Sequence, residues 1–116
     1  MTHWIKTQDG QEYAIRFTQV VYIQLSSMED IPSNQIQKFL SGFASWPLSR
    51  VYRFYWLAFK NGSRKENKDF DMTEEDFMYW VNDDETIFPQ ILKAMELSSP
   101  TEQKKTAPRA ATTGKR

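Results

Sequence analysis

The segment Trp46-Pro-Leu-Ser-Arg-Val-Tyr-Arg-Phe-Tyr-Trp-Leu-Ala-Phe59 restricts the fold more than any other part of the chain. Aromatic residues make up 15% of the 116 residues, and this segment holds the densest run of them. Pro47 is favoured in a first helical turn and Asn61-Gly62 favours a helix end, so we predict a helix from Pro47 to about Lys60. Because apolar side chains occupy every side of this helix, the rest of the domain or another protein must enclose it.

Two short helices are predicted before this central helix. The first begins after Thr18, a suitable N-cap, and ends before Pro32. Its apolar residues are Val20, Val21, Tyr22, Ile23 and Leu25. The second helix is capped by Ser33 or Asn34, and its apolar residues recur at intervals of three and four as far as Phe43.

Two more helices are predicted after the polar connection formed by residues 63–69. Thr73-Glu-Glu-Asp76 has the spacing of a capping box, with Asp in place of the usual Glu, so one helix begins there. Its inward stripe consists of Phe77, Trp80 and Val81. The last helix follows the acidic segment Asp83-Asp-Glu-Thr86 and holds Ile87, Ile91, Leu92, Ala94 and Met95. Pro89 must lie in its first turn, because proline lacks the N–H that a helix interior needs.

A β-hairpin is predicted at the N-terminus. Two short apolar-patterned runs, residues 3–8 and 11–17, flank Asp9-Gly10, and glycine supplies the positive φ of a tight turn. Alternation places Tyr13, Ile15 and Phe17 on one face, while the face of Trp4 depends on the register and stays open. We therefore predict a mainly α fold, a small domain of about five helices with an N-terminal β-hairpin, spanning residues 1–97.

The remaining residues, 98–116, have the composition of a disordered basic tail, because apolar residues almost vanish after Leu97. Residues 1–96 carry 10 basic and 14 acidic residues, a net charge of −4, whereas residues 97–116 carry 5 and 1, a net charge of +4. Lys104, Lys105 and Arg109 are the tail residues that we consider for a function.

The inventory of reactive side chains gives no sign of catalysis. The chain has no cysteine, its only histidine is His3, and no serine lies in a Gly-x-Ser-x-Gly turn, so we expect no enzyme and no cofactor. The alternating oxygens of Asp69 to Glu75 invite a calcium loop. However, the central glycine is missing and Trp80 stands at the twelfth position, so helix capping explains these carboxylates better and we expect no metal.

The sequence also indicates where the protein resides. The N-terminal residues lack a basic region followed by an apolar core and a cleavage site, and no apolar run approaches about 18 residues. The absence of cysteine fits a reducing compartment. We therefore expect a soluble cytoplasmic protein with no membrane partner.

The aromatic run suggests a protein-binding function. So small a domain should be unable to hide every ring, and one or two should serve as anchors for a partner. The partner-binding candidates are Trp46, Tyr52, Arg53, Trp56, Phe59 and Trp80.

A nucleic-acid-associated regulator is the alternative. Its binding patch would lie between Arg50 and Lys68, where cations alternate with Tyr52 and Trp56. The charge of −4 on the folded part opposes phosphate binding, so we do not expect a nucleic-acid partner. A salt titration separates the two hypotheses, because phosphate binding weakens steeply as salt rises.

The layout resembles the tail assembly chaperones of long-tailed bacteriophages and prophages, which are encoded between the major tail protein and the tape measure protein. Four segments carry the resemblance: Tyr13-Ala-Ile-Arg-Phe17, Tyr55-Trp-Leu-Ala-Phe-Lys60, Asp71-Met-Thr-Glu-Glu-Asp-Phe77 and Ile87-Phe-Pro-Gln-Ile-Leu-Lys-Ala-Met95. It covers roughly residues 12–97. The high aromatic content and Pro89 depart from the family's pattern, so no residue is carried over as a known contact.

This resemblance implies a non-catalytic function in the cytoplasm of a bacterial host. Such chaperones bind the aggregation-prone tape measure protein, keep it soluble and extended, and help to recruit tail tube subunits. The implied partners are thus the tape measure protein and the tail tube protein, and a homo-oligomer stays possible. Many of these phages extend the short product by a programmed frameshift, for which Lys104-Lys105 is a candidate site.

Overall fold

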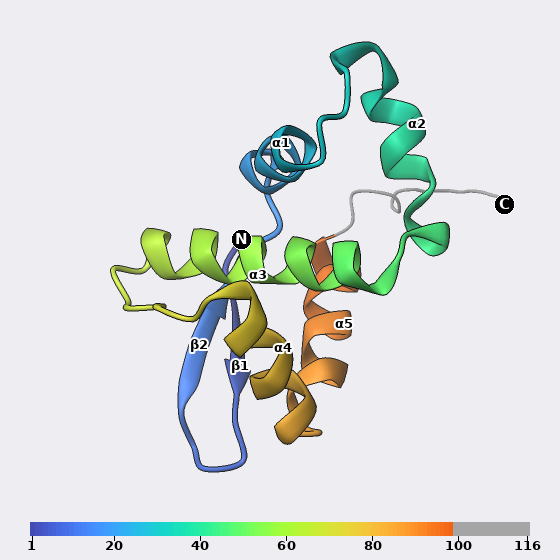
Figure 1. Cartoon of the computed structure of the whole chain (residues 1–116). Coiled ribbons are helices and arrows are strands. Elements are labelled where there is room, and N and C mark those ends of the chain that lie inside the picture. Colours follow the sequence, from blue (N-terminus) through green and yellow to red (C-terminus); the bar gives the residue numbers. More distant parts are fainter. Residues whose placement is uncertain (99–116) are drawn as a thin grey trace, which may run out of the picture.

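The computed structural model describes residues 1–98, and it confirms the predicted fold class (Figure 1). Its strands are β1 (His3–Lys6) and β2 (Glu12–Ile15). Its α-helices are α1 (Gln19–Met28), α2 (Ile36–Ser41), α3 (Leu48–Lys65), α4 (Glu74–Asp83) and α5 (Ile87–Ser98), and short 3₁₀ turns at Ser33–Gln35 and Phe43–Ser45 flank α2. The described part of the chain is therefore mainly helical, with an N-terminal hairpin.

The predicted tail begins one residue too early, since Ser98 still belongs to α5. The remainder of that prediction, including the candidates Lys104, Lys105 and Arg109, lies outside the described residues.

The hairpin register, which the sequence left open, is now fixed. Strands β1 and β2 are antiparallel, with Ile5 opposite Tyr13 and Trp4 opposite Ala14. Directly opposed residues share a face, so Trp4 lies on the reverse face from Tyr13 and Ile15. Gly10 has a φ of 89°, which confirms why the turn requires glycine.

Helix α3 is longer than predicted, because Gly62 does not end it. A side chain at Gly62 would place its Cβ 2.5 Å from the carbonyl carbon and oxygen of Ala14, so glycine lets the helix and β2 approach closely. The Arg16 N–H donates to the carbonyl oxygen of Ala58 at 3.0 Å, which ties β2 to the same helix. The predicted loop at residues 63–69 consequently begins only after Lys65.

The core forms where α3 contacts β2, α1 and α4. Phe54, Tyr55, Phe59 and Phe77 are each at most 1% exposed. The ring centroid of Phe59 lies 5.5 Å from the rings of both Phe77 and Trp80. Such contacts, made within an interior that excludes water, explain how the domain encloses most of its aromatic residues.

Local signals place the later helices correctly. Thr73 Oγ1 accepts a hydrogen bond from the Asp76 N–H at 3.1 Å, which confirms the N-cap of α4. Phe77 and Val81 are buried as predicted, and Trp80 packs partly buried against the core. Pro89 is the third residue of α5 and thus lies in its first turn.

Helices α1 and α2 form a separate layer. Figure 1 shows both on one side of α3, with the hairpin and α4 on the other side. Thr18 precedes α1 as predicted, although its hydroxyl makes no capping hydrogen bond. We call residues 19–45, which contain α1, α2 and both 3₁₀ turns, the α1–α2 arm.

Candidate protein-binding surface

The predicted aromatic anchors are more enclosed than expected. Trp46, Tyr52, Trp56 and Trp80 are partly buried and pack against the core. Phe59 is 0% exposed, so its prediction as a partner contact is wrong. The small size of the domain predicts that some rings stay uncovered. The rings of Phe70, Phe77 and Trp80 nevertheless surround that of Phe59.

Internal hydrogen bonds hold two of the tryptophans. The indole N–H of Trp46 donates to the Phe39 carbonyl at 3.1 Å, and that of Trp56 donates to the Met72 carbonyl at 2.8 Å. The ammonium of Lys60 lies 4.5 Å from the centroid of the Trp56 ring. These rings therefore have structural partners within the domain.

Arg53 also acts inside the domain. Its Nε lies 2.8 Å from Glu74 Oε2, and its Nη1 lies 2.6 Å from Glu29 Oε2. Arg50 Nε reaches the other oxygen of Glu29 at 3.1 Å. The hydrogen bond that Arg53 donates to Glu74, together with the one it donates to Glu29, raises the pKa of Arg53. This network, the α3 arginine clamp, connects α3 to the residue after α1 and to the first turn of α4.

The clamp weakens the case for nucleic-acid binding. Two cations of the proposed patch, Arg50 and Arg53, already face carboxylates. Lys60 lies over Trp56, and Lys68 lies 5.9 Å from the ring centroid of Trp4. A small cavity of about 190 Å³ beside the clamp is lined by Glu29, Arg53 and Glu74, whose charges are thus paired.

Apart from Leu48, the large apolar side chains that are exposed in residues 1–98 lie outside the aromatic run. Among the large ones, Ile23 on α1 is 63% exposed and Val20 is 48% exposed. Other members of this set are Met1, Trp4, Met28, Leu48, Met78, Tyr79, Leu92 and Leu97. The densest local group of exposed apolar side chains lies on the short helix α1 and consists of Val20, Ile23 and Met28.

A groove accompanies this group. A cavity of about 380 Å³ lies along the α1–α2 arm, and we call it the α1–α2 groove. It is lined by Gln19, Tyr22, Ile23, Ser26, Ser27, Ile31 and Leu40. Its volume is within the range of about 300–1,000 Å³ that binding pockets occupy.

The floor of the groove offers apolar contact rather than charge. The Ser26 hydroxyl donates to the Tyr22 carbonyl at 2.8 Å, so its hydrogen-bonding need is met. Burial raises the pKa of Tyr22, which therefore stays uncharged at neutral pH. Tyr22, Ile23, Ile31 and Leu40 supply the apolar surface. The groove consequently suits apolar side chains of a partner.

This exposed apolar surface is absent from the predicted partner contacts, although the sequence carries a signal for it. Five of the six residues from Val20 to Leu25 are apolar, which is more than one helix face can bury. The structure buries Val21 and Leu25 and leaves Val20 and Ile23 in solvent. We expected the aromatic run to expose side chains because it is apolar on more than one face, and this reasoning applies better to α1.

The described residues contain neither a cluster of metal-ligating side chains nor a helix suited to crossing a membrane. Nowhere in residues 1–98 do three or more His, Asp or Glu side chains gather as metal ligands would. No helix in this range has the length and apolar character that crossing a bilayer requires.

Comparison with known proteins adds no family to this geometry. No family model matches the chain, and the searches of curated proteins and of solved structures gave no significant match. The exposed surface and the resemblance in sequence therefore carry the functional proposal.

Proposed function

We propose that the protein is a non-catalytic chaperone that binds an apolar helical segment of another protein in the α1–α2 groove. The observation that carries this proposal is the exposure of Ile23 and Val20 beside an apolar groove, in a domain where Trp4 and Tyr79 are the only exposed aromatic side chains among residues 1–98. Contiguous apolar surface costs free energy in water and commonly marks a protein-binding site. Apolar residues spaced by three and four on a partner helix fit such a groove.

The client in this proposal is the tape measure protein of a long-tailed phage. The resemblance of residues 12–97 to tail assembly chaperones supports this client, which is a long, mainly helical protein. The chaperone would hold successive client helices in the cytoplasm of the bacterial host and help to recruit tail tube subunits. Binding through apolar side chains would allow many client segments to be held, since packing tolerates varied sequences.

Two matched variants test the groove. Ile23→Gln and Tyr79→Gln each replace an apolar side chain of nearly equal exposure, 63% and 64%, by the same helix-forming polar residue. Tyr79 lies on α4, on the other side of α3 from the groove (Figure 1). The measurement is the affinity of the full chain for the tape measure protein encoded beside it, with circular dichroism as the folding control.

We expect Ile23→Gln to weaken this binding by about tenfold or more, as loss of a central apolar anchor does. Tyr79→Gln should bind as the unaltered protein does, and raising salt should change the affinity little. Equal binding by both variants would exclude the groove as the binding surface. A neighbouring gene set without any tape measure protein would exclude the client but leave the groove open to other helices.

A further inference from the structure

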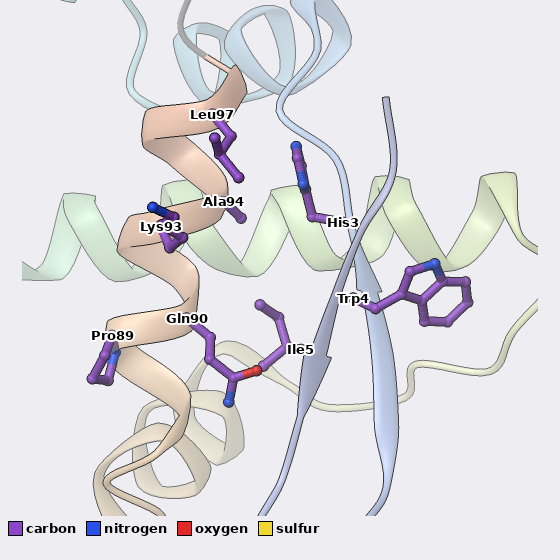
Figure 2. A pocket seen from close by; sticks show the side chains of 8 residues that line it. All are labelled: His3, Trp4, Ile5, Pro89, Gln90, Lys93, Ala94 and Leu97. Atoms are coloured by element: carbon purple, nitrogen blue, oxygen red, sulfur yellow. The ribbon is translucent and has the colours of Figure 1, made fainter.

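A second cleft lies far from the groove, between the outer edge of β1 and helix α5. Figure 2 shows it from close by, with His3, Trp4 and Ile5 on the strand and Gln90, Lys93 and Leu97 on the helix. The cleft has a volume of about 330 Å³. It contains no part of the α1–α2 groove, so an inference about it does not depend on the proposed chaperone function.

At one end of the cleft, Gln90 takes the place of a neighbouring strand. Its Nε2 donates to the Lys6 carbonyl at 2.7 Å, and its Oε1 accepts from the Lys6 N–H at 2.9 Å. A residue of an added β-strand would form this same pair of hydrogen bonds with Lys6. The Gln90 carboxamide thus shows that this edge accepts a peptide-like group.

The next position along the edge is Trp4. In an antiparallel pair, the main-chain groups of successive residues point alternately toward and away from the partner strand. The Thr7 N–H bonds to the Gln11 carbonyl at 2.9 Å and so faces the β2 side, whereas Lys6 faces away. By this alternation, the N–H and carbonyl of Trp4 face away from β2, on the side of Gln90.

The side chain of Trp4 leaves this edge accessible. In Figure 2 the indole points away from α5, so Trp4 contributes its main chain to the cleft. None of the tertiary hydrogen bonds among residues 1–98 engages that N–H or carbonyl. Trp4 therefore offers one donor and one acceptor at an unpaired strand edge, which is the geometry used in β-strand addition.

The positive charge of Lys93 favours an acidic ligand in the cleft. Lys93 has only a weak partner, Glu96 at 3.9 Å, and both side chains are more than two-thirds exposed. Burial, with the N-terminal amino group as a second cause, lowers the pKa of His3, so His3 is uncharged at neutral pH. Lys93 thus supplies positive charge at the cleft, and a carboxylate on the ligand would complement it.

We propose that this cleft binds an extended, acidic peptide segment of a partner protein, whose backbone pairs with Trp4 and whose carboxylate faces Lys93. Apolar side chains of the peptide would contact Leu97, which is 59% exposed at the same cleft. The cleft is short, so the paired segment covers only a few residues.

The main-chain pairing is tested by comparing Trp4→Pro with Trp4→Ala. Both remove the indole, but only proline also removes the outward N–H, and an edge strand tolerates proline where its N–H faces away from the sheet. The probe is a library of random seven-residue peptides. Peptides that bind the full chain are selected at a low and at a high concentration of the chain. The most enriched peptides are then titrated against each variant.

We expect acidic peptides to be enriched and to bind Trp4→Pro about two- to tenfold more weakly than Trp4→Ala, the effect of one lost hydrogen bond. Lys93→Glu should lose the acidic peptides, while Lys38→Glu, the same change on α2, should retain them. These two exposed-site variants keep the test decisive if Trp4→Pro fails to fold.

Three results would overturn the proposal. The first is enrichment no greater than in the unselected library, and the second is equal binding by Lys93→Glu and Lys38→Glu. The third is slow hydrogen exchange of the Trp4 N–H in the full chain without peptide. Exchange that remains slow on dilution would mean that the chain's own tail covers the edge, and exchange that becomes fast on dilution would mean that a second copy does.

Discussion

The α3 core buries large apolar side chains, whereas the α1–α2 arm leaves some of its own exposed to solvent. In the core, Phe59 is 0% exposed although it belongs to the aromatic run that we expected to be too dense to enclose, and Phe77 beside it is 0% exposed as well. On the arm, Ile23 is 63% exposed although α1 contains few aromatic residues. The density of rings in the sequence is therefore a poor guide to which apolar side chains stay exposed, whereas the number of elements that cover a helix is a good one.

The difference has a structural cause. Helix α3 contacts β2, α1 and α4, so neighbours are available to its rings on several sides. Helix α1 buries Val21 and Leu25, and α3 is its main contact, so its other apolar residues remain in solvent. A helix covered along one stripe but apolar on more than one face keeps surface for a partner.

The largest expected effect comes from the core. Phe59→Ala should lower the free energy of unfolding by about 3–5 kcal/mol, because it removes a fully buried ring and leaves a cavity. Ile23→Ala should change it by less than about 0.5 kcal/mol, because that side chain is mostly in solvent. Urea denaturation of both variants measures the difference, and similar losses would remove the contrast between core and arm.

Gly62 offers the next largest effect. Gly62→Ala should cost about 1–3 kcal/mol, because its Cβ would meet main-chain atoms of Ala14 and Ile15 at 2.5–2.6 Å, which cannot rotate away. Gly42→Ala on the arm is the control, since its nearest contacts lie at 3.6 Å. There, alanine should be neutral or stabilise by up to about 1 kcal/mol. Thermal unfolding of both variants tests this, and a harmless Gly62→Ala would refute the close approach of α3 and β2.

Removing the α3 arginine clamp should have a smaller effect. Arg53→Gln should cost about 1 kcal/mol, because the clamp is partly exposed and water screens it. Hydrogen exchange should quicken mainly near the C-terminal end of α1, which Glu29 follows. Lys93→Gln breaks a pair whose two side chains are more than two-thirds exposed, and it serves as the control. Unchanged exchange on the arm would show that the clamp does not hold it.

The smallest effect concerns acid stability at the hairpin tip. Hydrogen bonds from Thr86, and then from the Gln8 N–H, lower the pKa of Asp84 from 3.8. A carboxylate whose pKa is lowered on folding contributes stability above its unfolded pKa, and this is lost as the pH falls through the lower folded value. Asp84→Asn should therefore flatten the fall in stability below pH 3.8. An acid titration of Asp84→Asn that runs parallel to that of the unaltered protein would contradict this linkage.

Local sequence signals were sufficient for most of the elements. Thr73 marks the start of α4 and Pro89 fits the first turn of α5, because caps and proline act on their own few residues. Gly10 likewise identified the turn of the hairpin. These features depend on backbone conformation and hydrogen bonding within one turn, so the sequence alone reveals them.

Features that depend on distant residues were not predictable in this way. The sequence around Gly62 predicts a helix end, because nothing near this residue in the sequence reveals that Ala14 lies against it. The candidate Phe59 failed for the same reason, since its enclosure requires Phe77 and Trp80. The hydrogen bonds between Gln90 and Lys6 join residues 84 positions apart, and no pattern in the sequence predicts them.

The contact of β2 with α3 also sets an order of events during synthesis. A two-stranded hairpin alone is marginal in water, and here its stabilising neighbour includes Gly62, far along the chain. Strands β1 and β2 leave the ribosome before α3, so the hairpin lacks this neighbour until the middle of the chain has been synthesised. The nascent chain therefore passes through a stage in which Ile5 and Ile15 are not yet buried, and factors that shield newly made chains have their greatest opportunity then.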